Sequence, residues 1–304
     1  MNHELIVGVR VKHAIRTDWG LGEVVATDPS GILMVFFEDV GLKKFSLPVA
    51  QFLRVDGEEA DSDYLTALVR HYRSLSTSSL ANKKSGRTTF QKAVENFRSH
   101  FPRGFQDQAY LSGRRSERDY KMRAHELFIE TLGPSVLPLL LIEHKYKEIC
   151  DRAKAVINKT NLINQYEKIW LNNALVQSNA QKLFSCSLGT LLYGSHSLRE
   201  RFEQFASMLY EINAAKWPIA TYFLFLSDPE AQIFVKPEVT KSAAEVLGID
   251  INYKPELNWL TYSQVVRLAE AIRSKLVKEG QDYLVPRDLV DVQSFIWVTA
   301  PSYC

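Results

Sequence analysis

The chain has 304 residues, of which 46% are hydrophobic and 24% charged, and its net charge is +2. This composition is ordinary for a globular protein and argues against a disordered chain or a coiled coil, and the length suits two domains. The longest apolar runs are far shorter than the roughly 20 residues that cross a bilayer, so we expect no membrane partner. Three scattered cysteines form no zinc or disulfide pattern and the N-terminus shows no secretion signal, so we expect a cytoplasmic protein.

Residues 1–57 have the pattern of short strands separated by turns. Hydrophobic and charged residues alternate from Gly8 to His13, which is typical of a half-buried strand. Further β-segments are predicted at 23–27, 32–38 and 42–47. Four or five such segments are too few for a sandwich and favour a small curled barrel, which leaves no long exposed edge.

Four segments of this region share a recognisable motif: Val11-Lys12-His13, Trp19-Gly20-Leu21-Gly22-Glu23-Val24-Val25, Val35-Phe36-Phe37-Glu38 and Gly41-Leu42-Lys43-Lys44-Phe45. The pattern resembles the Tudor-like domain at the C-terminus of Rep-type DNA helicases, and it is similar to the polymerase-interacting domain of CarD-type transcription regulators. In those families the module docks onto a protein partner, RNA polymerase in particular, or lies near DNA. The resemblance therefore implies a recognition module rather than an enzyme.

The residues predicted to bind a partner through this module are Trp19, Lys43, Lys44 and Phe45. Trp19 and Phe45, with two neighbouring phenylalanines, have the side chains of an aromatic cage for methylated cations. Small barrels also need large aromatics to fill them, and core packing is the favoured interpretation. Lys43 and Lys44 suit contact with a nucleic acid or an acidic partner, and a solvated strand is the alternative.

Residues 58–63 are acidic or small and predict a linker to a mainly helical domain of residues 64–304. Helical periodicity predicts helices over 64–75, 90–101, 116–132, 136–156, 162–176, 181–192, 198–213, 219–226, 241–247, 261–278 and 286–298. Thr240 and Thr261 are the predicted N-caps of two of them, and residues 232–235 are predicted to form a short strand or an extended segment. The predicted fold class is α+β, a small Tudor/SH3-like β-barrel followed by a larger, mainly α-helical domain.

Residues 70–123 are strongly basic, with thirteen Lys and Arg against four acids, a net charge of +9 in a chain of net charge +2. Positive charge favours contact with phosphates through counterion release, and exposed aromatics stack on unpaired bases. The predicted nucleic-acid-binding residues are Lys83, Lys84, Arg87, Lys92, Arg98, Arg103, Arg114, Arg115, Arg118 and Lys121. A solvated helix face is the alternative, and for the interleaved phenylalanines core packing is favoured.

Several short strings of the helical region resemble segments of uncharacterised bacterial proteins associated with genome maintenance or phage defence. They are Glu117-Arg118-Asp119-Tyr120-Lys121, Lys159-Thr160-Asn161-Leu162, Ile233-Phe234-Val235-Lys236-Pro237, Pro286-Arg287-Asp288-Leu289 and Asp291-Val292-Gln293-Ser294-Phe295-Ile296-Trp297. The resemblance implies no known chemistry. Asp288 and Asp291, three residues apart, are explained by the helix dipole, which favours acids in a first turn.

No phosphate-binding loop, dinucleotide fingerprint, nucleophile elbow or zinc spacing occurs in the sequence, so we expect no cofactor and no metal. Glu143 and Lys145 form an E-x-K after an apolar run, a shape found in metal-dependent nucleases, but they continue a helical pattern. The function predicted is a non-enzymatic adaptor in genome maintenance, transcription or phage defence, binding DNA or RNA through the basic segment and a protein through the barrel. A cryptic nuclease and a structural subunit of a larger complex are the alternatives.

Overall fold

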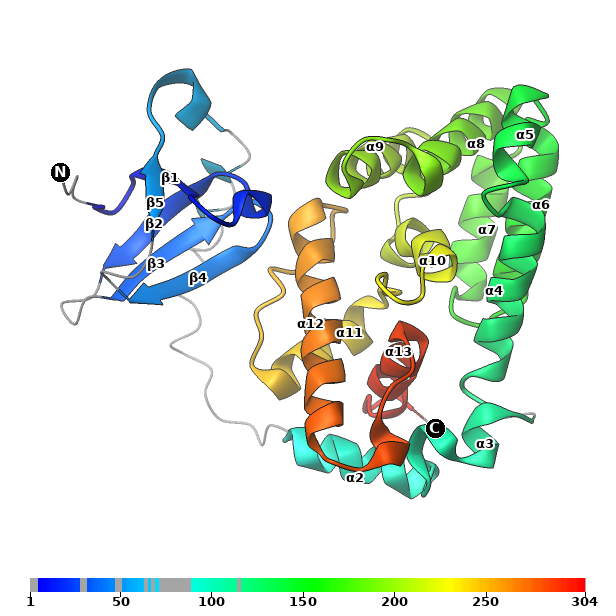
Figure 1. Cartoon of the computed structure of the whole chain (residues 1–304). Coiled ribbons are helices and arrows are strands. Elements are labelled where there is room, and N and C mark those ends of the chain that lie inside the picture. The colour runs from blue at the N-terminus through cyan, green and yellow to red at the C-terminus, as the bar shows by residue number, and fades with distance from the viewer. Residues whose placement is uncertain are drawn as a thin grey trace. The chain divides into compact units, whose positions relative to one another are not determined.

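A computed structural model describes residues 5–27, 32–46, 51–62, 65–66, 69–70, 89–113 and 116–303. The chain divides into two compact units, Met1–Gly86 and Arg87–Cys304, which we call the strand unit and the helical unit (Figure 1). The first contains an antiparallel sheet and the second is mostly helical, so the predicted α+β class is confirmed. None of the helices in the described ranges combines the length and apolar character needed to cross a membrane.

The strand unit contains five antiparallel strands in the order β4-β3-β2-β1-β5. Their bounds are β1 Arg10–His13, β2 Gly22–Thr27, β3 Ile32–Phe37, β4 Gly41–Ser46 and β5 Phe52–Arg54. Alternate residues point into one apolar core, in which Val11, Val24 and Leu33 are completely buried. Gly22 is required beside this core, because a Cβ there would come within 2.6 Å of the Phe37 ring.

The segment after β5 contains a 3-10 turn, Gly57–Ala60, which overlaps the start of the predicted linker. Ser62 then accepts a hydrogen bond from the backbone N of Leu65 at 3.0 Å. Residues 65–66 and 69–70 are helical, and Leu65 and Val69 are buried as the predicted periodicity requires. The rest of the helix predicted over 64–75 lies outside the described residues.

The helices of the helical unit are α2 Phe90–His100, α3 Gln108–Leu111, α4 Asp119–Leu132, α5 Leu137–Ile142, α6 Tyr146–Asn158, α7 Gln165–Ala174, α8 Ser178–Tyr193, α9 Leu198–Glu211, α10 Trp217–Ser227, α11 Pro237–Leu247, α12 Trp259–Lys278 and α13 Leu289–Val298. Two 3-10 turns, η4 Gly104–Gln106 and η5 Asp282–Leu284, pack against each other. Most of the predicted helices are therefore present.

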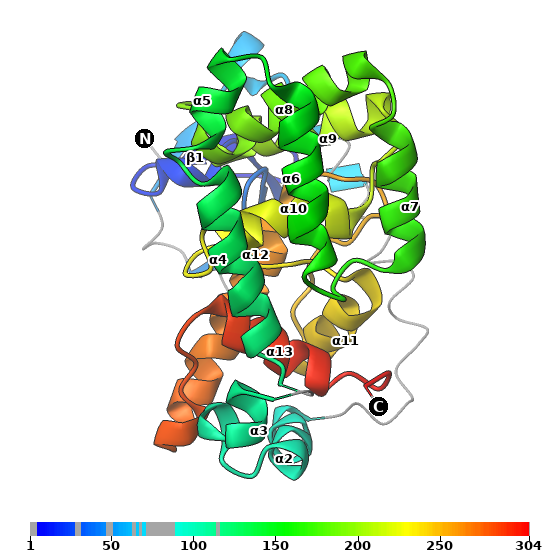
Figure 2. The same cartoon turned by 90° about the vertical axis from the view of Figure 1, so that its right-hand side faces the viewer.

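Two helices, α10 and α13, are buried almost throughout. All residues of α10 from Trp217 to Leu226 are buried, as are all residues of α13 from Leu289 to Ile296. A helix that is hydrophobic on every side, as α10 is, belongs in the interior of a domain. α13 is also buried, although it carries polar residues such as Asp291 and Ser294, which form hydrogen bonds inside the unit. The α10 helix accordingly packs against α4, α8 and α9 in the middle of the unit, and α13 packs against α2, α11 and α12 (Figures 1 and 2).

The run from residue 136 to residue 156 forms two helices, so the prediction of one continuous helix was wrong. α5 ends at Ile142 and α6 begins at Tyr146. His144 between them has a φ of 56°, a left-handed conformation that a right-handed helix cannot contain. Residues 232–235, predicted to be extended, form no strand.

The helix starts that differ from the predictions include three for which a particular first residue or N-cap was predicted. α11 begins at Pro237, whose fixed φ suits a first helical position, so Thr240 lies inside the helix. α12 begins at Trp259, and its N-cap is Asn258, whose side chain accepts from the backbone N of Thr261. Likewise α13 begins after Asp288 rather than at residue 286.

Candidate functional site

The ten cations predicted to contact nucleic acid fall into three groups. Five lie outside the described residues: Lys83, Lys84, Arg87, Arg114 and Arg115. Three are exposed on or directly after α2: Lys92, Arg98 and Arg103. Two near the start of α4 are largely or fully withdrawn from solvent: Arg118 and Lys121.

The exposed cations of α2 lie on the side of the helix that faces away from the core. α2 buries Ala93, Val94 and Phe97, which leaves Lys92 and Arg98 exposed. The Arg98 guanidinium lies 5.7 Å from the centroid of the Tyr283 ring, a cation–π contact that fixes it beside η5. Because its ring partner carries no charge, the positive charge of Arg98 stays available to an anion.

The last turn of α12 adds two exposed cations that the sequence interpretation missed, Lys275 and Lys278. The Lys275 ammonium lies 5.3 Å from the centroid of the Phe90 ring, which places the end of α12 beside the start of α2. Their signal in the sequence is only a pair of lysines in a last turn, which the helix dipole also explains. We use the term α2 face for five cations: Lys92, Arg98, Arg103, Lys275 and Lys278. Within the described part of the chain, none of the five has an ion-pair partner.

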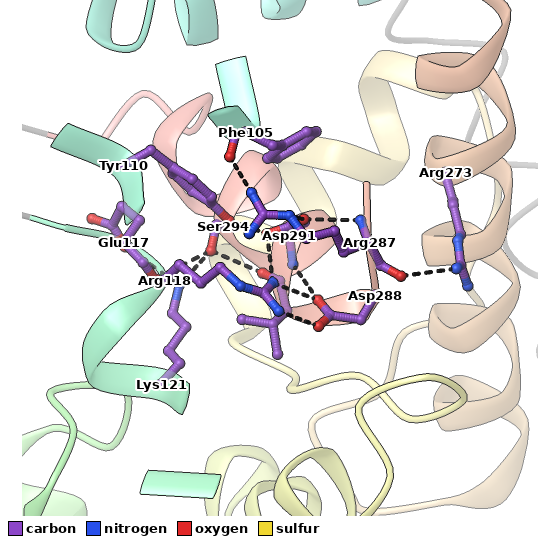
Figure 3. A network of polar contacts seen from close by, with 11 residues as sticks. Phe105, Tyr110, Glu117, Arg118, Lys121, Arg273, Arg287, Asp288, Asp291 and Ser294 are labelled. Carbon is purple, nitrogen blue, oxygen red and sulfur yellow. Dashed lines mark hydrogen bonds and ion pairs between the residues drawn. The ribbon is translucent and has the colours of Figure 1, made fainter. Parts of the chain in front are cut away.

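A network of buried charges joins the segment before α4 to the start of α13 (Figure 3). The Arg118 guanidinium donates to the two carboxylate oxygens of Asp288 at 2.9 and 2.6 Å, and to Asp291 Oδ1 at 2.7 Å. Burial by itself would lower the pKa of Arg118, but the hydrogen bond to Asp288 and the charges of both aspartates raise it. Bidentate, charge-assisted bonds of this kind are among the strongest in proteins.

Asp291 is the fully buried centre of the network. Its Oδ1 also accepts the Tyr110 hydroxyl at 2.5 Å, and its Oδ2 accepts the backbone N of Arg287 at 2.9 Å. The Arg287 side chain lies 3.6 Å from Oδ2 and donates to the backbone carbonyl of Phe105. Both carboxylate oxygens therefore have donors, as a buried charge requires.

Lys121 is completely buried beside this network. Its ammonium donates to Ser294 Oγ at 2.8 Å and to Glu117 Oε2 at 3.3 Å. Burial lowers the pKa of Lys121 from 10.5 to about 8, although the Glu117 carboxylate opposes the change. In this structure Lys121 and Arg118 hold α13 against the α4 segment, and neither presents its charge on the exposed surface.

The aromatic residues interleaved with the basic segment pack in the core, as the favoured interpretation predicted. Phe97, Phe101, Phe105 and Tyr110 are 4% exposed or less. The Phe97 ring lies 4.9 Å from that of Phe105 and 5.3 Å from that of Phe295. The faces of these rings are therefore covered by other side chains.

A cleft of about 880 Å³ lies beside the network. Its walls come from the end of α2, the start of α4, the end of α13 and the residues that follow α13. The lining includes His100, Glu117, Tyr120, Asn161, Trp297 and Tyr303. Glu117 belongs both to the cleft and to the ion pair with Lys121.

The short strings noted in the sequence meet around this cleft. Glu117 and Tyr120 come from the first string, Asn161 from the second and Trp297 from the last. From the string at 233–237, the Lys236 ammonium lies 4.5 Å from the centroid of the Trp297 ring. Segments far apart in the sequence thus contribute to one site, an arrangement that the sequence interpretation did not predict.

Comparison of the chain with protein-family models, curated proteins and solved structures found no match.

In the strand unit, three of the four predicted partner-binding residues lie together. The ring centroid of Trp19 lies 6.1 Å from that of Phe45 and 5.7 Å from the Lys43 ammonium. Lys44 is exposed and, because strand residues alternate, it lies on the opposite face from Lys43. The Arg16 guanidinium also lies over Trp19, at 5.1 Å, so the ring already contacts two cations of its own chain.

Glu143 and Lys145, the residues of the nuclease alternative, lie in the turn between α5 and α6. They pair with each other at 2.8 Å, and their side chains are about half exposed. The apolar run before them forms a helix. No group of three His, Cys, Asp or Glu side chains that could hold a metal ion occurs in the described ranges.

Proposed function

We propose that this protein is a non-enzymatic adaptor that binds nucleic acid through the α2 face of the helical unit and a protein partner through the strand unit. The observation that supports nucleic-acid binding is the α2 face itself. Its five cations are exposed, and none has an ion-pair partner among the described residues. Three of them belong to the segment 70–123, whose net charge is +9.

The strength of this contact follows from counterion release. Each phosphate that a cation neutralises contributes about 0.9 to the slope of log affinity against log salt for duplex DNA, and about 0.7 for single strands. If all five cations of the α2 face contact phosphates, the slope is roughly −3.5 to −4.5. Affinity then falls roughly 100- to 500-fold between about 50 and 200 mM salt.

The strand unit is proposed to be a Tudor/SH3-like barrel. In a flat sheet β4 and β5, at opposite ends of the strand order, would be about 19 Å apart at the usual spacing of neighbouring strands. The ring centroids of Phe45 on β4 and Phe52 on β5 are only 4.9 Å apart, which supports a strongly curled sheet. The proposed partner residues are the four predicted from the sequence: Trp19, Lys43 and Phe45, which lie together, and Lys44, which lies on the other face of β4.

The test of nucleic-acid binding is a salt titration of the full chain with labelled single- and double-stranded DNA and RNA, with and without Mg²⁺. The double variant Lys92→Ala/Lys275→Ala should weaken binding and reduce the salt slope by about 1.4 to 1.8. The matched control, Lys147→Ala/Lys182→Ala, removes the same charge from exposed lysines of α6 and α8 and should leave binding nearly unchanged.

Each alternative function predicts a different result. Binding that is absent near physiological salt would refute the adaptor and favour a structural subunit. Equal losses in the two double variants would show that total charge, rather than the α2 face, attracts the nucleic acid. Cleavage that needs Mg²⁺ and disappears in Glu143→Ala would establish the nuclease. For the strand unit, Lys43→Glu, which reverses the charge beside Trp19 and Phe45, should abolish capture of a partner without changing the fold, and undiminished capture would count against the proposed surface.

A further inference from the structure

The cleft has an aromatic corner that no other feature of the fold explains. The Trp297 and Tyr303 rings are perpendicular, with centroids 6.2 Å apart, and the His100 ring meets Tyr303 edge-on at 5.0 Å. Perpendicular rings offer one face for stacking and one edge to complete the contact. Lys236 contacts the Trp297 ring at 4.5 Å, which fixes the indole in place. The corner therefore suits a planar ring.

The polar side of the cleft offers a hydrogen-bond acceptor. Glu117 is only 8% exposed, and its Oε2 accepts both from the Tyr120 hydroxyl at 3.2 Å and from the Lys121 ammonium at 3.3 Å. Within the described residues, Oε1 has no donor. A carboxylate accepts only, so a ligand must bring an N–H or O–H group to this oxygen.

The charge balance around Glu117 limits the class of ligand further. Because the Lys121 ammonium already balances the negative charge of the Glu117 carboxylate, the cleft does not require a cationic ligand. A neutral ring that carries an amino group matches both the aromatic corner and the free acceptor. Among nucleobases, cytosine, adenine and guanine have such a group. Thymine and uracil lack it, and their ring N–H lies between two carbonyl oxygens, which a carboxylate repels.

The position of the cleft connects it to the α2 face. His100, the last residue of α2, lines the cleft, and it lies between Arg98 and Arg103 in the sequence. The cleft and the α2 face therefore share the end of α2, which would bring the bases of a strand bound at Arg98 and Arg103 within reach of the cleft. Unpaired bases of such a strand are free to turn toward an aromatic platform.

We propose that the cleft lined by Glu117, Trp297 and Tyr303 binds an unpaired nucleobase with an exocyclic amino group, from the strand held by the α2 face. This inference rests on the proposed function. The base stacks in the corner formed by Trp297 and Tyr303, and its amino group donates to Glu117 Oε1. Recognition is therefore of single-stranded nucleic acid, with a preference for bases that carry an amino group.

The test compares labelled oligo(dC) and oligo(dT) of equal length on the full chain at equal salt. The two bases are pyrimidines of similar size, but the amino group of cytosine is replaced in thymine by a carbonyl, which a carboxylate repels, so wild type should bind oligo(dC) about tenfold more tightly, within the usual range for one base-edge contact. Glu117→Gln should remove this preference. Tyr303→Ala should weaken oligo(dC) binding without changing the salt slope, and Tyr303→Phe, which keeps the ring, should bind like wild type.

The outcomes separate this inference from the proposed function. Equal affinity for the two oligonucleotides, with the salt slope of the α2 face intact, overturns the base site and leaves the adaptor standing. No binding of either oligonucleotide overturns both. A preference for oligo(dC) that survives in Glu117→Gln also overturns the inference, because another group would then read the base. Circular dichroism of each variant verifies that the helical fold is kept, and Tyr303→Ala provides a test outside the buried ion pair.

Discussion

Replacement of Lys121 by methionine tests the buried ammonium through the pH dependence of stability. Burial lowers the pKa of Lys121 in the folded chain from 10.5 to about 8. Since the folded pKa lies below the unfolded one, the unfolded chain binds more protons between these values, and stability rises with pH across this window. The full difference corresponds to about 3 kcal/mol, of which about 2 kcal/mol falls between about pH 7.5 and 9.5.

The assay is urea unfolding of the full chain, followed by far-ultraviolet circular dichroism at about pH 7.5 and 9.5. Relative to Lys121→Met, the wild type should gain about 2 kcal/mol at the higher pH. The control is Lys182→Met, an exposed lysine of α8 whose ammonium is hydrated in both states. Its difference from wild type should not change with pH. If wild type and Lys121→Met respond to pH equally, Lys121 does not fold as a buried lysine and the reasoning is refuted.

Two further substitutions test the packing around the network. Arg118→Met leaves two buried aspartates without their guanidinium and should lower the free energy of unfolding by about 3–5 kcal/mol; a loss below about 1 kcal/mol in urea unfolding would contradict the buried ion pair. Gly104→Ala should lower the melting temperature, because Gly104 has a φ of 52° and a Cβ would meet the Tyr283 carbonyl at 2.3 Å. Gly113 also has a positive φ, 103°, but a Cβ there would meet no other atom within 4 Å. Gly113→Ala should therefore lower the melting temperature less than Gly104→Ala, and equal decreases would show that backbone strain alone is the cause.

The strands and most helices were predictable because local periodicity determines them. The alternation from Gly8 to His13 and the apolar run of α10 each appear within a few residues of sequence. The predictions were wrong where a single residue interrupts the hydrophobic periodicity or caps a helix at another position. His144 interrupts the run at 136–156 with a left-handed backbone, and Asn258, not Thr261, caps α12. Each of these exceptions depends on the conformation or hydrogen bond of one residue, and a hydrophobic pattern averaged over many residues does not detect it.

The network and the cleft were not predictable, because they join segments that periodicity treats separately. Arg118 and Lys121 are three residues apart, as are Asp288 and Asp291, so complementary charges recur at one helical spacing in two distant strings. This match in spacing was a signal in the sequence that the two strings could lie together. Read singly, however, the two cations predicted a phosphate contact and the two acids predicted a dipole effect. Only the packing of α13 against the α4 segment shows that Arg118 pairs with both acids and that Lys121 bonds to Ser294 of α13 and to Glu117 instead.

The sequence separation within the network has a consequence for synthesis of the chain. Arg118 precedes its partner Asp288 by 170 residues. At the usual elongation rate, about 5–20 residues per second, roughly 9 to 34 s pass between their additions. During that interval the first charged string of the helical unit has no carboxylates from α13 to pair with, and α13 itself, a central helix of the core, is missing. The helical unit therefore completes its fold late, so a ribosome that stalls before α13 leaves Arg118 and Lys121 solvated and the core open to chaperones and proteases.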